Sequence, residues 1–129
     1  MADVCIFVVD DDFLIAQSVE DALTDGGFLT ATANNGSDGL ALMDKRGPEC
    51  RALVTDVNLG DKVTGWDVAR AARMKFPYLP VVYVTADSSH EWTAHGVPES
   101  ILITKPFAPA QVVSAVAQLL NRESNDHDA

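Results

Sequence analysis

Short apolar runs alternate with helical stretches along most of the chain, and this alternation constrains the fold more than any other feature. The runs are rich in β-branched residues, and they cover residues 4–9, 28–33, 52–55, 81–85 and 101–104. A short apolar run of this kind is typical of a strand that is buried on both faces. Strands that alternate with helices favour a parallel sheet with right-handed crossovers and helices on both faces. The sequence therefore predicts an α/β fold.

Helical periodicity fills the intervals between these runs. Residues 14–24 carry apolar side chains at helical spacing, and Gly26 follows them as a stop signal. The other expected helices carry Leu40 to Met43, Val68 to Ala72, residues 88–95, and residues 109 or 110 to 120. The last helix is expected to end at Leu120, and the polar residues 122–129 are expected to form a flexible acidic tail. We therefore expect one domain at residues 1–121.

Size, composition and charge limit the class of protein. A chain of 129 residues with 47% hydrophobic and 22% charged residues fits one soluble globular domain. The formal net charge of -10 disfavours binding to nucleic acid or anionic lipid, because such binding depends on basic side chains. No stretch approaches the roughly 18 apolar residues of a membrane span, and Cys5 and Cys50 form neither a disulfide framework nor a metal-ligand set. We expect a cytoplasmic protein without nucleic-acid or membrane partners.

Charged and hydroxyl side chains follow several of the predicted strands where each strand ends. They are Asp10, Asp11 and Asp12 after the first strand, Asp56 after the third, Thr85 at the end of the fourth and Lys105 after the fifth. Length and periodicity leave the strand order open. The flavodoxin-like order 2-1-3-4-5 brings these residues to one edge of the sheet, where ligands bind in such folds. Acidic side chains gathered there repel one another, so we expect a cation between them.

Phosphoryl transfer needs a set of residues of this kind. Carboxylates hold Mg²⁺, and the metal and a lysine neutralise charge on the transferred group. An aspartate oxygen can serve as the nucleophile. We therefore interpret Asp56 as the acceptor of a phosphoryl group beside a metal ion, with Lys105 as a counter-charge.

Four short motifs together resemble the receiver domain of bacterial two-component response regulators. They are Val8-Val9-Asp10-Asp11-Asp12, Leu53-Val54-Thr55-Asp56, Val84-Thr85-Ala86 and Thr104-Lys105-Pro106-Phe107. The resemblance extends from residue 4 to about residue 120. The segments Asn58-Leu59-Gly60 and Gly96-Val97-Pro98 are similar to those of stand-alone or kinase-associated receivers. The resemblance implies a flavodoxin-like, doubly wound sheet of five parallel strands in the order 2-1-3-4-5.

The resemblance also implies a role for each residue of the site. Asp56 is the implied phosphoacceptor, and Thr85 and Lys105 are implied to contact the phosphoryl group. The implied Mg²⁺ ligands are Asp10, Asp11, Asp56 and the backbone carbonyl of Asn58. Pro106 is implied to follow a cis peptide bond. The implied donor is a histidine kinase or a histidine phosphotransfer protein. Such a domain assists its own phosphorylation and dephosphorylation and is not otherwise an enzyme. As a monomer or weak homodimer, it changes its contacts with a downstream protein that the sequence does not name.

Two positions depart from the usual receiver pattern. Receivers commonly have Met-Pro soon after the acceptor, whereas this chain has Leu59-Gly60 and a longer loop up to Gly65. The aromatic residue expected three positions before the lysine is replaced by Leu102. We therefore expect the acceptor chemistry to be kept and the coupling between the hydroxyl residue and an aromatic switch to be altered.

Two other functions fit parts of the pattern. Asp10-Asp11-Asp12 can be interpreted as the Asp-x-Asp motif of a small Mg²⁺-dependent phosphatase of the haloacid-dehalogenase type, although the further acidic motif that such enzymes carry after the lysine is missing. A degenerate receiver that acts only as a binding module is the other alternative, because Leu102 and the unusual loop depart from the family pattern.

Several polar and aromatic residues have a purely structural interpretation. Asp12 is expected to cap the helix that follows it, because carboxylates favour helix N-termini. The side chains of His90, His95 and His127 lack the spacing of a metal site. Trp66 and Trp92 are expected to contribute to packing or to a partner surface.

Overall fold

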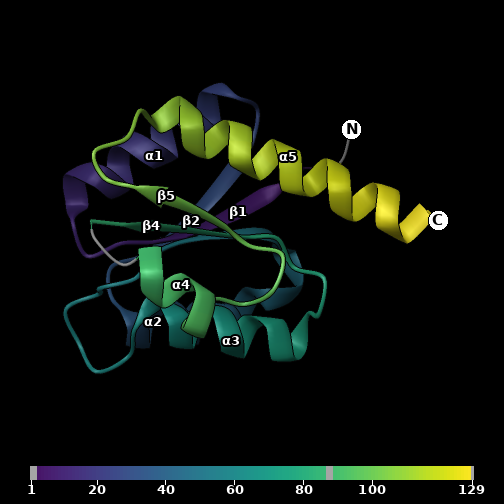
Figure 1. Cartoon of the computed structure of the whole chain (residues 1–129). Helices are drawn as coiled ribbons and strands as arrows, with labels where there is room; N and C mark the ends of the chain where they lie inside the picture. Colours follow the sequence, from purple (N-terminus) through teal and green to yellow (C-terminus); the bar gives the residue numbers. More distant parts are fainter. Residues whose placement is uncertain (1–2, 87–88, 129) are drawn as a thin grey trace.

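A five-stranded parallel sheet forms the centre of the molecule, with helices on both of its faces (Figure 1). The structure is a computed structural model that describes residues 3–86 and 89–128. The strand order β2-β1-β3-β4-β5 confirms the predicted order. The strands are β1 (Cys5–Val9), β2 (Leu29–Ala33), β3 (Cys50–Asp56), β4 (Val81–Thr85) and β5 (Ile101–Thr104).

The helices form two layers around this sheet (Figure 1). One layer contains α1 (Phe13–Asp25) and α5 (Pro109–Asp128), and the other contains α2 (Gly36–Arg46), α3 (Gly65–Lys75) and α4 (Ser89–His95). A 3-10 helix, η1 (Gly47–Glu49), leads from α2 into β3. Within residues 3–86 and 89–128, none of the helices has the length and apolar character needed to cross a membrane.

Two separate apolar cores explain why the strands are apolar at successive positions. On β1, Phe7 and Val9 belong to the core that also contains residues of α2 and α3, whereas Ile6 and Val8 belong to the core shared with α1 and α5. Side chains alternate between the two faces of a strand, so a strand covered on both sides needs an apolar residue at each position. Burying each large side chain contributes roughly 1.5 to 3 kcal/mol to folding.

The register of the sheet brings the strand ends to one edge. Val9 is paired with Thr55, Asp56 with Val84, and Thr85 with Thr104. The polar residues that end or follow these strands therefore lie side by side along the carboxyl edge, as the predicted strand order requires.

The elements differ most from their predicted bounds at two places, and the other predicted ends differ by one residue or not at all. β3 begins at Cys50 rather than at residue 52, because η1 already turns the chain toward the sheet before that point. The last helix was predicted to end at Leu120 but continues to Asp128. The apolar stripe stops at Leu120, yet no glycine or proline follows Pro109 to break the helix. The flexibility of the acidic tail stays a prediction, and residue Ser88 and the side chains of His90 and His127 lie outside the described part.

Candidate functional site

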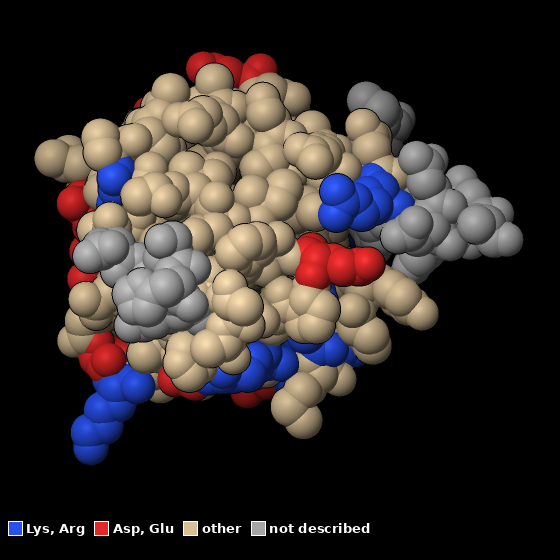
Figure 2. Space-filling model, viewed as in Figure 1, with Lys and Arg blue, Asp and Glu red and all other residues tan. Residues whose placement is uncertain are grey.

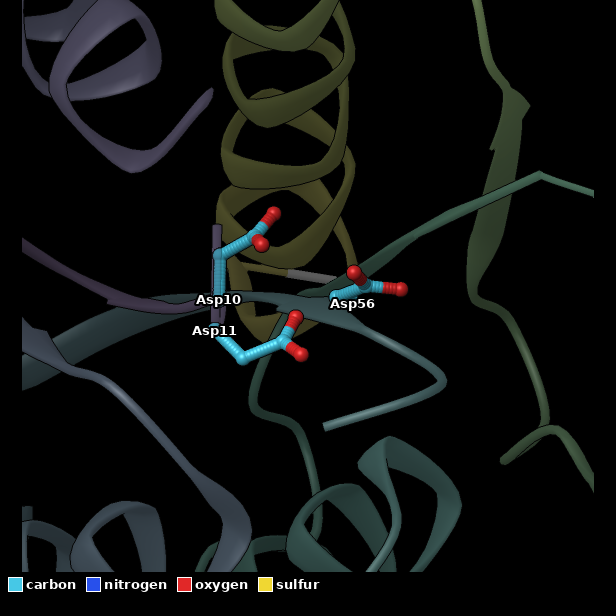
Figure 3. Close-up of side chains that lie close together, drawn as sticks. All are labelled: Asp10, Asp11 and Asp56. Atoms are coloured by element: carbon cyan, nitrogen blue, oxygen red, sulfur yellow. The ribbon is translucent and has the colours of Figure 1, made fainter. Parts of the chain in front are cut away.

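Three aspartates converge where β1 and β3 end (Figure 3). Asp10 and Asp11 follow β1 directly, and Asp56 is the last residue of β3. Each side chain offers a carboxylate oxygen, and these oxygens all lie within 4.8 Å of one another. Asp10 and Asp56 are only 4% and 6% exposed, whereas Asp11 is exposed. The structure thus brings together the three acidic side chains that the sequence predicts as metal ligands. In Figure 2, acidic atoms gather along the edge of the molecule at which the strands end.

The side chain of Asp12 binds backbone N–H groups of α1, unlike the side chains of Asp10 and Asp11. Its Oδ1 atom accepts hydrogen bonds from the backbone N–H groups of Leu14 at 3.0 Å and Ile15 at 3.2 Å. Asp12 is therefore the N-cap of α1, as predicted. Its own N–H group donates to Oδ1 of Asp10 at 2.9 Å, which holds the Asp10 carboxylate in place.

Asp10 is held in a poor environment for a negative charge. Burial is the main cause that raises the pKa of its carboxyl group to about 6, because a buried carboxylate loses its hydration. The hydrogen bond from Asp12 lowers this pKa and the charge of Asp56 raises it. Lys105 lowers it to a smaller extent, so the single lysine does not balance the acidic cluster. A cation bound between the carboxylates would supply the missing positive charge.

Lys105 provides the positive charge that the site already has. Its Nζ atom donates a hydrogen bond to Oδ2 of Asp56 at 3.0 Å, and both side chains are largely buried. Burial alone would lower the pKa of Lys105, but the hydrogen bond and charge of Asp56 raise it above its ordinary value. The backbone N–H of Lys105 donates to the carbonyl oxygen of Thr85 at 2.7 Å, and the peptide bond to Pro106 is cis, as predicted.

A cleft of about 560 Å³ opens over these side chains. Its lining consists of Asp11, Asp12, Asp56, Asn58, Gly60, Thr85, Ala86 and Lys105. Thr85 is only 3% exposed, whereas Asn58 is exposed and donates its backbone N–H to Oδ1 of Asp56 at 3.2 Å. Both oxygens of the Asp56 carboxylate therefore have a fixed partner, Asn58 on one side and Lys105 on the other.

The donor set at this cleft suits Mg²⁺. Mg²⁺ prefers oxygen ligands and is commonly held by one or two carboxylates together with waters. Asp10, Asp11 and Asp56 offer such oxygens in close proximity, and the raised pKa of Asp10, caused chiefly by burial, is consistent with a site short of positive charge. The residues present therefore fit the ion that the sequence predicts.

The loop after β3 contributes a backbone contact that sequence reasoning missed. Gly60 has a φ angle of 73°, a conformation that favours glycine. A Cβ atom at this position would lie 3.2 Å from Oδ2 of Asp11, so the loop passes close to a candidate metal ligand. The pair Leu59-Gly60 signals a turn, but its contact with Asp11 depends on the tertiary fold. Leu59, only 2% exposed, anchors this loop in the core.

The position of the expected aromatic switch is taken by a half-buried Leu102 on β5. Its neighbour across the sheet is Tyr83 on β4, which is fully buried. The Tyr83 hydroxyl accepts a hydrogen bond from the backbone N–H of Val97 at 3.1 Å, and its ring lies 4.6 Å from that of Trp66. An aromatic side chain thus lies beside Leu102, but its contacts hold it inside the core.

Fold and site together define a class of protein, namely an α/β domain with an acidic cleft at the carboxyl edge of its five-stranded parallel sheet. The sequence pattern of the response regulator receiver domain matches residues 6–117. The chain therefore belongs to the response regulator receiver family, and it is a receiver domain of two-component phosphorelay signalling. This confirms the resemblance, and it favours neither the phosphatase nor the binding-module alternative.

Similar proteins agree with this assignment. The probable transcriptional regulatory protein TcrX of Mycobacterium tuberculosis is 35% identical over 121 residues, which cover 92% of this chain and 50% of that protein. A response regulator receiver protein from Sinorhizobium medicae has a crystal structure with a TM-score of 0.90 and 37% identity, covering 94% of this chain and 97% of the other. The chemotaxis protein CheY4 of Vibrio cholerae gives a TM-score of 0.81 at 28% identity, covering 92% and 99%. The chain spans about half the length of the curated relatives it matches.

Proposed function

We propose that Asp56 is the phosphoacceptor of this receiver domain. The observation that carries the proposal is the pairing of a nearly buried Asp56 with Lys105 at 3.0 Å, beside two further carboxylates within 4.8 Å. Mg²⁺ would be held by Asp10, Asp11 and Asp56 together with the backbone carbonyl of Asn58. Thr85 and Lys105 would contact the phosphoryl oxygens, because both line the same cleft.

The proposed reaction transfers a phosphoryl group from a ring nitrogen of histidine to a carboxylate oxygen of Asp56. A carboxylate oxygen of Asp56 attacks the phosphorus of a phosphohistidine, the P–N bond breaks, and an acyl phosphate forms while the histidine ring takes up a proton. The contacts from Lys105 and Asn58 hold the Asp56 carboxylate in a fixed orientation, which reduces the entropic part of the barrier. The Lys105 ammonium group offsets the negative charge of the transferred group, and bound Mg²⁺ supplies further charge neutralisation. Water attack on the acyl phosphate later returns the domain to its starting state.

Chemical mapping of the phosphorylated residue tests this proposal. We expect acetyl phosphate to label the protein only when Mg²⁺ is present, and the label to be lost in alkali as an acyl phosphate is. Borohydride reduction of that acyl phosphate should yield homoserine at position 56, which mass spectrometry of peptides will locate. Homoserine at position 10 or 11 instead, or an alkali-stable label, would contradict the assignment.

We further propose that the protein phosphodonor, a histidine kinase or phosphotransfer protein in the cytoplasm, docks beside this cleft. Phe13 and Leu14 on the first turn of α1 are 70% and 77% exposed, although both are large and apolar. A groove of about 550 Å³ continues from Leu14 to Lys105, and it is lined by Leu14, Ile15, Ser18, Lys105, Pro106, Phe107 and Pro109. Lys105 also lines the acidic cleft, so a partner in this groove reaches the acceptor.

Substitution of Leu14 separates the docking of a protein donor from the chemistry. We expect Leu14→Arg to slow phosphotransfer from a donor protein by roughly tenfold or more. The reason is that a charge replaces an apolar side chain that the bound donor would bury at the centre of the interface. Labelling by acetyl phosphate should stay unchanged, since the small donor needs no docking surface. Leu29→Arg is the matched control, because Leu29 is 51% exposed on β2 and lies outside the groove. Equal transfer rates for both variants would place the donor elsewhere.

A further inference from the structure

The loop between β3 and α3 is tied to another part of the chain by a single acidic side chain. Oδ2 of Asp61 accepts hydrogen bonds from the backbone N–H and the hydroxyl group of Ser37, at 3.2 Å and 3.0 Å. Its other oxygen, Oδ1, accepts from the backbone N–H of Val63 at 3.0 Å. One carboxylate thus joins the first turn of α2 to the loop of residues 57–64.

The contact uses donors that α2 cannot satisfy by itself. The first N–H groups of a helix have no partner within the helix. The N-cap residue Asn35 accepts from the N–H of Asp38 at 2.7 Å, and Asp61 takes the N–H of Ser37. Partial loss of hydration acts to raise the pKa of Asp61, but hydrogen bonds from Ser37, Val63 and Gly36 lower it overall. The ionised side chain is therefore the form that this contact favours.

Backbone packing also holds the loop of residues 57–64 against the start of α2. A Cβ atom on Gly36 would lie only 2.2 Å from the carbonyl oxygen of Val63, so the loop lies directly against the start of α2. On its other side the loop carries Gly60, which passes close to the carboxylate of Asp11. Asp61 is the residue after Gly60, so its anchor lies next to the point at which the loop meets the candidate metal ligands.

We propose that Asp61 is a positioning residue for the cleft, which holds Gly60 and Asn58 in place by anchoring their loop on α2. This inference rests on the proposed function, because it concerns the Mg²⁺ ligands assigned above. Asp61 itself does not line the cleft. It acts through the loop, which carries Asn58, whose backbone carbonyl would hold the ion, and which passes close to the Asp11 carboxylate at Gly60.

The test compares Mg²⁺ affinity across a set of matched variants. We expect Asp61→Ala to raise the dissociation constant for Mg²⁺ by roughly tenfold, the lower end of the loss that follows when the support of a metal ligand is removed. Asp61→Asn should give a smaller change, because its amide oxygen can still accept from Ser37. Ser37→Ala, which alters no charge, should shift the affinity in the same direction. Calorimetric titration with MgCl₂ measures the affinity, and hydrogen exchange at the Val63 amide reports on the loop.

Two controls separate positioning from general effects. Asn35→Ala removes the side-chain cap of α2 but leaves the contact of Asp61, so it should lower stability without changing Mg²⁺ affinity. Asp44→Asn removes an equal charge near the other end of α2, where Asp44 pairs with Lys75, and should also leave the affinity unchanged. If Asn35→Ala weakens Mg²⁺ binding as much as Asp61→Ala does, the role of Asp61 is only structural and the inference is overturned.

The outcome also distinguishes this inference from the proposed function. Wild-type protein that binds Mg²⁺ and is labelled at Asp56, alongside an Asp61→Ala variant of equal affinity, overturns the positioning role alone. Wild-type protein that neither binds Mg²⁺ nor takes up a label overturns the proposed function, and the positioning role with it. At saturating Mg²⁺ we expect Asp61→Ala to recover the wild-type labelling rate, because the reacting groups are unchanged.

Discussion

Replacement of Asp56 with asparagine is expected to reduce labelling by acetyl phosphate to the background level that unfolded protein gives. The amide of asparagine is not a nucleophile toward phosphorus, so no acyl phosphate can form at this position. The fold should persist, because the amide oxygen can still accept the hydrogen bond from Lys105 or from the Asn58 backbone. Labelling is measured with radioactive acetyl phosphate and Mg²⁺, and folding is checked by circular dichroism.

Asp12→Asn is the matched control for this experiment. Asp12 belongs to the same acidic run as the candidate metal ligands, but its side chain caps α1, a task that asparagine performs equally well. We expect the labelling of this variant to stay within about twofold of the wild-type value. Stable labelling of Asp56→Asn would contradict the assignment. Labelling that survives Asp56→Asn but is lost in Asp10→Asn would point instead to phosphatase-type chemistry at Asp10.

The parts of the fold and site that the sequence predicts are those that depend on local pattern and strand order. Apolar runs locate β4 and β5 with their observed bounds, because both strands are short and end at a clear change in residue type. Once the strand order is known, the carboxyl edge of the sheet must hold Asp10, Asp56 and Lys105 together. The structure adds the distances and the burial that separate Asp10 and Asp56 from the exposed Asp11.

The parts that the sequence does not predict depend on contacts between distant segments. Asp61 and Ser37 are 24 positions apart, and neither residue type signals that the two will meet. The close approach of Gly60 to Asp11 is of the same kind, because it requires the loop to be docked first. The extension of α5 past Leu120 has another cause. Hydrophobic periodicity reports which helical residues face a core, whereas a helix can continue beyond that core until a breaker residue stops it.

The surroundings of Leu102 also combine a feature that the sequence predicts with one that only the structure shows. The sequence shows that Leu102 replaces the usual aromatic residue, and only the structure shows that Tyr83 lies next to it across the sheet. The hydroxyl of Tyr83 is held by Val97, in the segment between α4 and β5. Thr85 lies two positions further along β4, so its side chain points to the same face of the strand as that of Tyr83. If Thr85 contacts a phosphoryl group as proposed, the nearest position on the same face of β4 is therefore a packed tyrosine rather than a residue free to rotate.

Replacement of Asp10 with asparagine should stabilise the metal-free protein while it weakens the binding of Mg²⁺. The pKa of Asp10 is raised to about 6, mainly by burial, from an ordinary value of 3.8. The folded state therefore resists ionisation of this group, at a cost on the order of 2 to 3 kcal/mol at neutral pH. Asparagine carries no charge, and its oxygen can still accept the hydrogen bond from the Asp12 N–H. We expect a gain of about 2 kcal/mol in the free energy of unfolding at pH 7.5 in EDTA.

The pH dependence shows whether this charge is the cause. Because the folded pKa lies above the unfolded one, the unfolded wild-type protein ionises Asp10 first as the pH rises. The stability associated with this group is therefore fully present below about pH 4 and is lost as the pH rises to about 6. The free energy of unfolding in urea is measured by tryptophan fluorescence. The value for Asp10→Asn should equal that of the wild type at pH 4 and exceed it at pH 7.5. Equal stabilities at pH 7.5 would show that Asp10 is ionised without cost.

Mg²⁺ should reverse the order of stability of the two proteins. A cation between the carboxylates offsets the cost of burying the Asp10 charge, which is the main cause of its raised pKa, and the smaller repulsion from Asp56, so the wild type gains stability from ligand binding. Asp10→Asn loses a direct ligand, and its dissociation constant for Mg²⁺ should rise by at least about tenfold, the loss seen even for outer-sphere partners. Asp11→Asn is the control, because Asp11 is exposed: it should weaken Mg²⁺ binding without stabilising the metal-free protein. Only a buried ligand can combine both effects, which separates the task of Asp10 from that of its neighbour.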